Sequence, residues 1–231
     1  MKEHVGVVIP ARNEEQLIAR CLASVRVAAT AAGGRVTIVV VADACTDRSV
    51  ELAQRFASES GTTAEWIVEA VDLENVGEAR ALGSRRAIDR GCSWLAHTDA
   101  DSVVPPNWIR EQRAISRAGI DVMIGTVRPD FADLSPAHVE KWRATHIPGR
   151  PNGHVHGANL GLSVQRYLDV GGFSPMPEHE DVDLVHRLRK AGAVFIASDR
   201  AEVMTSGRFD GRTAGGYAGH LRGIARELEL S

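Results

Sequence analysis

The sequence of 231 residues predicts an α/β fold in which helices cover both faces of an open, mostly parallel, Rossmann-like sheet. Short β-branched runs alternate with longer segments of helical periodicity through the first half of the chain. The run 36–41 is almost entirely β-branched, which is typical of a strand buried on both faces. Helix-linked parallel strands require right-handed crossovers, so a ligand is expected beyond the carboxyl ends of the strands.

The first half of the chain is regular. Strands are predicted at residues 5–9, 36–41, 66–71 and 93–97, and helices at 13–32, 47–58 and 75–90. In the first helix, Leu17, Cys21 and Val25 recur at the spacing of one helical face. This half therefore predicts four parallel strands joined by three helices.

The second half of the chain is less regular. Helices are predicted at residues 105–118, 136–145 and 180–190, and strands at 122–127 and 194–197. Glycine and proline crowd into residues 146–159, which predicts an irregular loop over the site. Five glycines in residues 207–219 predict a segment that closes over a ligand. Because no sharp change in composition divides the chain, a single domain is expected over residues 1–231.

Composition and charge argue against several classes of function. The formal net charge is −3 and the Lys and Arg residues are scattered, so no surface for nucleic acid or an anionic membrane is expected. The longest apolar run, residues 37–42, is far shorter than the ~20 residues that span a bilayer, and no signal segment opens the chain. Three cysteines, an odd number, fit a reducing compartment. A cytoplasmic protein without a transmembrane segment is therefore expected.

Two carboxylates follow the fourth predicted strand. Asp99 and Asp101 are separated by one residue, so in an extended backbone both side chains point the same way, toward the expected ligand. Two oxygen ligands without neighbouring Cys or suitably spaced His favour Mg²⁺ or Mn²⁺, which often complete their coordination with water and substrate phosphates. Asp-Ala-Asp before Ser is also common in simple turns, so a structural role stays open.

Other acidic residues follow a strand or begin a helix. Asp43 follows the most hydrophobic strand, too early to cap the next helix, and is a candidate acceptor for a ligand base. Glu180 and Asp181 open a helix, where the macrodipole favours the ionised carboxylate that a general base requires. Acidic residues at such positions also simply stabilise helices, so both interpretations stay open.

Six segments, in this order, resemble the family 2 glycosyltransferases, which have the GT-A fold of the nucleotide-diphospho-sugar transferase superfamily. They are Val7-Val-Ile-Pro-Ala-Arg-Asn-Glu-Glu15, Val40-Val-Ala-Asp-Ala-Cys-Thr-Asp-Arg-Ser49, Asn75-Val-Gly-Glu-Ala-Arg-Ala-Leu-Gly83, His97-Thr-Asp-Ala-Asp101, Gly157-Ala-Asn-Leu-Gly-Leu-Ser163 and His179-Glu-Asp-Val-Asp-Leu184. The fourth is similar to the family's Asp-x-Asp metal motif, and the last to its Glu-Asp catalytic block. Six ordered matches make coincidence implausible.

The resemblance implies that residues 1–104 bind a UDP- or GDP-sugar and that residues 105–231 bind the acceptor. On the donor side it implies contacts from Pro10, Ala11, Arg12, Glu14, Asp43, Arg80, Asp99 and Ala100. Asp43 would accept a hydrogen bond from the base, and Asp99 would lie near the ribose. On the acceptor side it implies Ala158 and Asn159, with His154 and His156 of the irregular loop as further candidates.

The resemblance also implies the chemistry. Asp101 would hold Mg²⁺ or Mn²⁺, with His220 as a candidate additional metal ligand. Asp181 would take the proton from the acceptor hydroxyl as that oxygen attacks the anomeric carbon, which gives inversion, and Glu180 would orient Asp181 or the acceptor. Two arginines are candidates for contacts with the diphosphate, Arg208 and Arg212.

Some features depart from the family or favour other functions. The chain has neither the Gln-x-x-Arg-Trp block nor the membrane helices of many processive members, so polymer synthesis is not expected. With 2 Tyr and 5 Phe it offers few aromatic platforms for a long glycan, which favours a small-molecule acceptor. A homodimer is compatible with the sequence. A nucleotidyltransferase of the same fold would share the metal chemistry, but no Gly-rich, Lys-containing segment follows the first strand. A non-catalytic nucleotide-sugar-binding module is the other alternative. A dinucleotide oxidoreductase is not expected, because residues 10–15 lack Gly-x-Gly-x-x-Gly.

Overall fold

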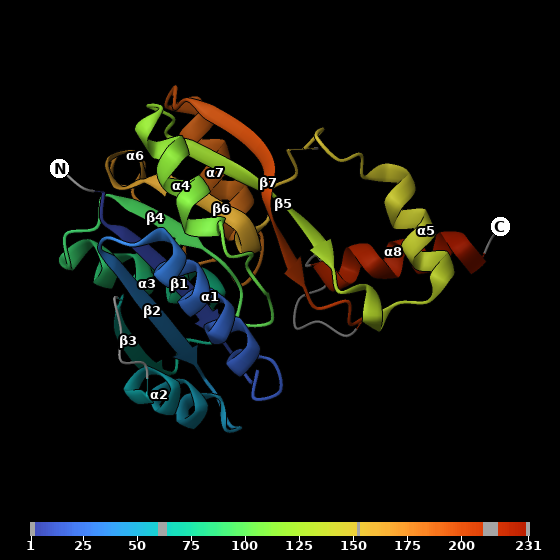
Figure 1. The fold of residues 1–231 in the computed structure, drawn as a ribbon, viewed down its shortest axis with the longest axis horizontal. Coiled ribbons are helices and arrows are strands. Elements are labelled where there is room, and N and C mark those ends of the chain that lie inside the picture. The colour runs from blue at the N-terminus through green and yellow to red at the C-terminus, as the bar shows by residue number, and fades with distance from the viewer. Residues whose placement is uncertain (1–2, 60–63, 152, 210–216, 230–231) are drawn as a thin grey trace.

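The computed structural model describes residues 3–59, 64–151, 153–209 and 217–229 (Figure 1). Within these ranges, seven strands form one sheet in the order β3-β2-β1-β4-β6-β5-β7. The strands are β1 (Val5–Ala11), β2 (Val36–Asp43), β3 (Ala64–Val71), β4 (Trp94–His97), β5 (Val122–Pro129), β6 (Leu160–Ser163) and β7 (Phe195–Thr205). The helices are α1 (Ile18–Ala32), α2 (Ser49–Glu59), α3 (Val76–Asp89), α4 (Trp108–Arg117), α5 (Pro136–Thr145), α6 (Val164–Asp169), α7 (Glu180–Lys190) and α8 (Tyr217–Glu229).

The sheet is mostly parallel and is covered on both faces. β6 runs antiparallel to its neighbours β4 and β5, and the other strand pairs are parallel. Along β2, Ile38 and Val40 join the apolar core under α1 and α4, whereas Val39 and Val41 join the core under α3 and α7. Burial of each such side chain contributes roughly 1.5–3 kcal/mol. The predicted α/β fold is therefore confirmed.

Three elements, β6, α6 and α8, depart from the sequence prediction. β6 has four residues and contains Gly161, where an added Cβ would lie 2.0 Å from Oε1 of Gln112. Gln112 of α4 accepts a hydrogen bond from Nε1 of Trp94 at 2.7 Å, and the glycine leaves room for this side chain against the sheet. The same glycine interrupts the apolar sequence pattern by which a strand is predicted. α6 has only six residues, and α8 contains Gly219 and Gly223, which are poor helix formers.

β5 and β7 extend away from the other strands and carry α5 and α8 with them (Figure 1). The two helices pack through a small apolar cluster that includes Trp142, Leu221 and Ile224. β7 is much longer than the predicted strand 194–197, because it is an edge strand with many polar residues and therefore lacks an apolar run. None of the helices in the described ranges is both long enough and apolar enough to cross a membrane.

The imidazole of His97, at the end of β4, predicts a pH dependence of stability. The side chain is fully buried against the ring of Phe173, and neither ring nitrogen has a hydrogen-bond partner within the described ranges. Burial and the nearby Arg80 lower the pKa of His97 well below 6.5. Below that pH the unfolded chain binds a proton that the folded protein does not, so stability falls as the pH falls.

We therefore expect His97 to cost about 2 kcal/mol of unfolding free energy between pH 7.5 and pH 5.0. Guanidinium denaturation at the two pH values measures this loss. His97→Leu should make the pH dependence shallower by that amount, whereas His186→Gln, at an exposed position of α7, should leave it unchanged. Equal pH dependence in wild type and His97→Leu would contradict the assignment.

Candidate active site

The carboxyl ends of β1, β2 and β4 open into a cleft of about 550 Å³, which is large enough for a small organic ligand. The beginnings of α7 and α8 and part of the irregular loop complete its walls. The cleft is lined by Pro10, Ala11, Arg12, Glu14, Asp43, Arg80, Asp99, Ala100, Asp101, His154, His156, Ala158, Glu180, Asp181, Arg208 and His220. The fold thus brings together residues that are far apart in the sequence.

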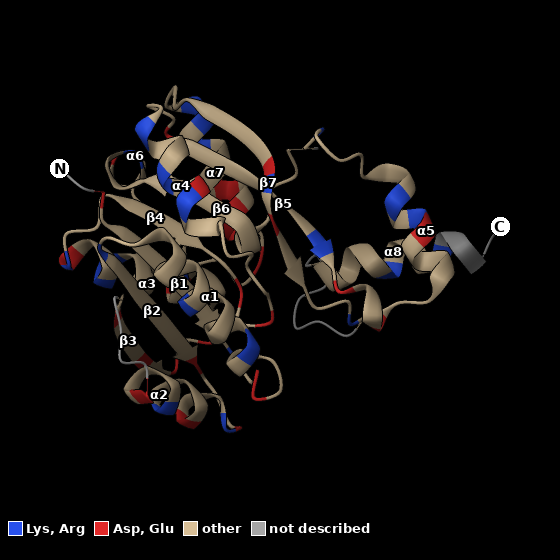
Figure 2. Ribbon diagram, viewed as in Figure 1, with Lys and Arg blue, Asp and Glu red and all other residues tan. Residues whose placement is uncertain are grey.

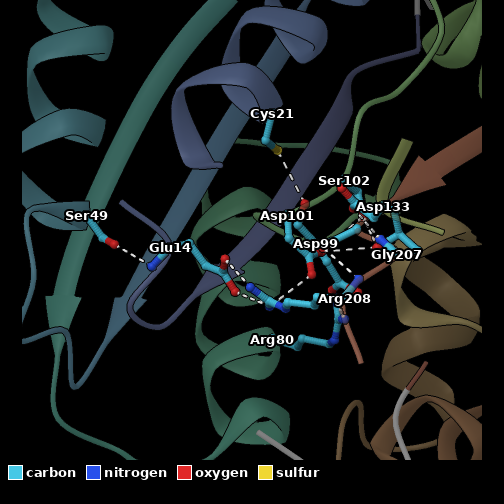
Figure 3. Close-up of polar contacts among 12 residues, drawn as sticks. Glu14, Cys21, Ser49, Arg80, Asp99, Asp101, Ser102, Asp133, Gly207 and Arg208 are labelled. Carbon is cyan, nitrogen blue, oxygen red and sulfur yellow. Dashed lines mark hydrogen bonds and ion pairs between the residues drawn. The ribbon is translucent and has the colours of Figure 1, made fainter. Parts of the chain in front are cut away.

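Arg80 of α3 joins two of the predicted functional segments at the base of the cleft. Its Nε donates to Oε1 of Glu180 at 2.8 Å. Its Nη2 donates to Oδ1 of Asp99 at 2.6 Å, and Figure 3 shows these two residues. Burial alone would lower the pKa of this guanidinium, but Asp99 and Glu180 raise it above its ordinary value, so Arg80 stays charged. Gly157 permits this packing, since an added Cβ would lie 2.3 Å from Nη2 of Arg80.

Arg208, which follows β7, lies between two carboxylates (Figure 3). Its Nη2 is 2.6 Å from Oε1 of Glu14 and 3.0 Å from Oδ2 of Asp101. The preceding segment is fixed because the amide of Gly207 donates to Oδ2 of Asp133 at 2.8 Å. A cationic group is therefore held where Glu14 and Asp101 converge, although Arg208 and Glu14 are 194 positions apart.

Burial and the neighbouring Asp99 and Glu14 raise the pKa of Asp101 to about 6, although Arg208 acts in the opposite direction. The hydroxyls of Ser102 and Thr205 donate to its Oδ1 at 3.3 and 3.2 Å. Carboxylates that repel one another in a buried place are stabilised by a nearby cation, and oxygen donors suit Mg²⁺ or Mn²⁺. The residues present thus fit a divalent cation at Asp101. Within the described ranges, however, no three His, Cys, Asp or Glu side chains form a metal-binding group.

Asp43 holds the turn between β3 and α3. Its Oδ1 accepts from the amides of Leu73 at 2.6 Å and Glu74 at 2.9 Å, and its Oδ2 accepts from that of Asn75 at 2.9 Å. The sequence indicated neither these contacts nor their partners. They fix the carboxylate at the cleft wall, where contact with a nucleotide base stays a prediction.

Asp181 lies in the first turn of α7 and faces the Gly157 segment. Its Oδ2 accepts from the amide of Gly157 at 2.6 Å, across 24 residues. His179, the residue before the helix, adopts a left-handed conformation with φ of 63° and turns the chain into the helix. The carboxylate thus lies at the wall of the cleft, where its role as a base stays a prediction.

Asn159 does not line the cleft, unlike the other predicted acceptor residues. It is 1% exposed; its Nδ2 donates to the carbonyls of Thr126 at 2.9 Å and Ala201 at 3.0 Å, while its Oδ1 accepts from Nε1 of Trp108. The side chain therefore joins β5, β7 and α4, which the motif could not reveal.

Tyr217, at the start of α8, lines the cleft and was missed by sequence reasoning. Its ring centroid lies 5.6 Å from that of His156 and 5.8 Å from that of His220, and its hydroxyl accepts from Nε1 of Trp142 at 3.1 Å. The sequence feature that could have indicated Tyr217 is its position directly after two glycines of a segment expected near the ligand, since the chain has only two tyrosines. Most of that segment, including Arg212, lies outside the described residues.

Several solved structures share the fold of this chain at low sequence identity. The mannosyltransferase PcManGT from Pyrobaculum calidifontis, in complex with GDP-Man and Mn²⁺, has a TM-score of 0.70 and 18% identity; the match covers 100% of this chain and 65% of that one. TarS 1-349 of S. aureus, in complex with UDP, has a TM-score of 0.64 and 14% identity over 88% of this chain and 61% of that one. These neighbours confirm the GT-A fold.

Sequence comparison identifies the family. The undecaprenyl-phosphate 4-deoxy-4-formamido-L-arabinose transferase of Pseudomonas aeruginosa (strain LESB58) is 34% identical over 131 residues, which cover 56% of this chain and 37% of that protein. The corresponding transferase of Edwardsiella ictaluri (strain 93-146) is 30% identical over 57% of this chain and 39% of its own. The match thus spans less than two fifths of these relatives. The profile described as "Glycosyl transferase family 2" matches residues 6–162, more than half of the chain, which therefore belongs to this family of sugar-transferring enzymes.

Proposed function

We propose that the chain is an inverting, metal-dependent glycosyltransferase that moves a sugar from a nucleotide-diphosphate donor to an acceptor in the cleft. The observation that carries the proposal is the placement of Asp99 and Asp101 beside the first turn of α7, with Asp181 in the same cavity. Charge neutralisation for a leaving diphosphate and a base for an acceptor thus lie within one site.

The donor would lie over the carboxyl ends of β1, β2 and β4, as expected for an open parallel sheet. UDP in TarS and GDP-Man in PcManGT support a UDP- or GDP-sugar. Asp43 and Arg12 would contact the nucleoside, and Asp99 the ribose. Residues 1–104 would thus serve as the donor half of the domain, and residues 105–231 as the acceptor half.

The metal would be Mg²⁺ or Mn²⁺, held by Asp101, and PcManGT with Mn²⁺ supports this choice. When bound, such a cation neutralises negative charge that develops on the leaving diphosphate. Arg208 would then turn from Asp101 toward the donor's phosphates, for which a guanidinium is well suited. His220 is retained as a candidate metal ligand because it lines the same cleft.

Asp181 would take the proton from an acceptor hydroxyl as the acceptor oxygen attacks the anomeric carbon opposite the leaving group. Its contact with the Gly157 amide would orient the carboxylate, and Glu180, held by Arg80, would fix the start of α7. Ala158 and His156 would border the acceptor.

The acceptor would be a small molecule with a hydroxyl group. The names of the P. aeruginosa and E. ictaluri relatives point to a different acceptor, undecaprenyl phosphate, whose oxygen is already ionised at neutral pH. The presence of a carboxylate in the position of a base favours the hydroxyl, because a phosphate needs no base.

Calorimetric titration of the purified chain with UDP and GDP, with Mn²⁺ and then with EDTA, tests the donor site. We expect one nucleotide to bind in Mn²⁺ and its affinity to fall at least about tenfold in EDTA, because the cation joins the diphosphate to Asp101. ADP serves as the control nucleotide. Absence of binding by both UDP and GDP in Mn²⁺ would contradict the proposed donor site.

A further inference from the structure

A second cavity, of about 420 Å³, lies behind β5. The two cavities share this strand as a wall: Val127 lines the cleft, whereas its neighbours Thr126 and Arg128 line the second cavity. The opposite wall comes from α5 and from residues 146–151, the beginning of the irregular loop. The strand separates any occupant of this cavity from the sugar-transfer site.

Basic side chains outnumber acidic ones in the walls of the second cavity. Arg128, Arg143 and Arg150 accompany Asp199 and Glu202. Both acids are already engaged, since Glu202 lies 3.4 Å from Nε of Arg128 and Asp199 accepts a hydrogen bond from a loop amide. Figure 2 shows the basic residues on β5 and α5. Arg143 and Arg150 have no ion-pair partner within the described ranges, so the cavity offers two guanidinium groups to an anion.

Rings form the floor of the cavity. Trp142 and His146 stack at 3.6 Å between centroids with an angle of 11°, and Phe131 meets the edge of this pair 5.3 Å from Trp142. The guanidinium of Arg143 lies 5.0 Å from the centroid of Phe131, which holds the charge beside the rings. Ile147, 56% exposed, adds apolar surface at the rim. The floor suits a flat, apolar group next to an anion.

We infer that the second cavity is a binding site for a molecule that carries a phosphate or carboxylate group next to a ring. Arg143 and Arg150 bind the anion, and the ring packs on the aromatic floor. This site is distinct from the proposed donor and acceptor sites. Its wall is nevertheless connected to the cleft, because Nε1 of Trp142 donates to the hydroxyl of Tyr217 at 3.1 Å.

Calorimetric titration of the full chain with phenyl phosphate at low ionic strength tests the inference, with phenol and inorganic phosphate as the two part-ligands. Phenyl phosphate should bind at least about tenfold more tightly than either, since only it uses both the guanidinium groups and the rings. Benzoate should compete with it. A phenyl phosphate affinity no higher than that of phenol or of inorganic phosphate would overturn the proposed ligand class.

Variants locate the binding. The double substitution Arg143→Gln and Arg150→Gln should weaken phenyl phosphate binding at least about tenfold. The matched pair Arg85→Gln and Arg110→Gln removes the same charge at exposed positions of α3 and α4 and should change the affinity less than about twofold. Equal losses in both pairs would overturn the location.

Thermal unfolding separates binding from folding. The Arg143 and Arg150 variant should keep a melting temperature close to that of wild type while it loses affinity, because both side chains are exposed. Titration of the Arg143 and Arg150 variant with nucleotide and Mn²⁺ should match wild type, so failure of the donor proposal and failure of this one are distinguishable.

Discussion

Asp181→Asn should lower the rate of transfer to a hydroxyl acceptor by about 10²- to 10⁴-fold, the range that general-base catalysis typically supplies. The amide still fills the space and can contact the backbone of Gly157, so the cleft should keep its shape. Nucleotide affinity in Mn²⁺ should change less than about twofold, because the proposed role of the carboxylate is toward the acceptor and not the donor. Single-turnover transfer and calorimetry on the same preparations measure the two effects.

Asp183→Asn is the matched control, because it removes the same charge one half-turn further along α7. Asp183 pairs with Arg187 and Ser174 and does not line the cleft, so transfer should stay close to the wild-type rate. The size of the effect of Asp181→Asn depends on the class of acceptor. A phosphate acceptor has no proton to remove, so with it the variant should lose less than about tenfold in transfer rate. A wild-type rate with a hydroxyl acceptor would show that Asp181 is not the base.

Asp101→Asn should abolish metal-dependent nucleotide binding, with an affinity loss of at least about 100-fold in Mn²⁺. Substitution of groups that merely orient metal ligands costs about 10- to 100-fold, and loss of a ligand should cost more. The residual affinity should equal that of wild type in EDTA. Calorimetry with the nucleotide that wild type binds measures the loss.

Asp72→Asn is the control for this experiment, because it makes the same change of charge at an exposed position outside the cleft lining. Its Mn²⁺-dependent affinity should match wild type. Wild-type affinity in Asp101→Asn would mean that the cation is held by other groups. The predicted metal site at the end of β4 would then be wrong.

The sequence predicts well what local patterns encode. Asp99 and Asp101 follow a strand, and strand ends of a parallel sheet meet at one edge, so their place in a cleft could be anticipated. The order of strands and helices up to β4 follows from the same periodicity. β6 was missed because Gly161 interrupts a strand of only four residues, which makes it invisible to an apolar pattern.

Partners that are distant in sequence could not be predicted. Asp43 looked available to a ligand because nothing near it in sequence showed that three amides of the turn before α3 donate to it. Asn159 was expected to contact the acceptor because its motif resembles the acceptor-side segment of the family, yet its amide bonds to groups of three separate elements. Such contacts depend on how the elements pack, which a single sequence does not encode locally.

Arg208 supplies the counter-ion for the two carboxylates that it contacts, Glu14 and Asp101. Because its guanidinium lies against Glu14 and Asp101, a metal ion that binds as proposed would have to displace this tethered cation. Breaking these ion pairs would reduce the free energy of metal binding. A polyanion that binds together with the metal could pair with the released arginine and so offset this loss. If Asp101 holds a metal as proposed, the cleft should therefore favour joint binding of the cation and a phosphate over binding of either one alone.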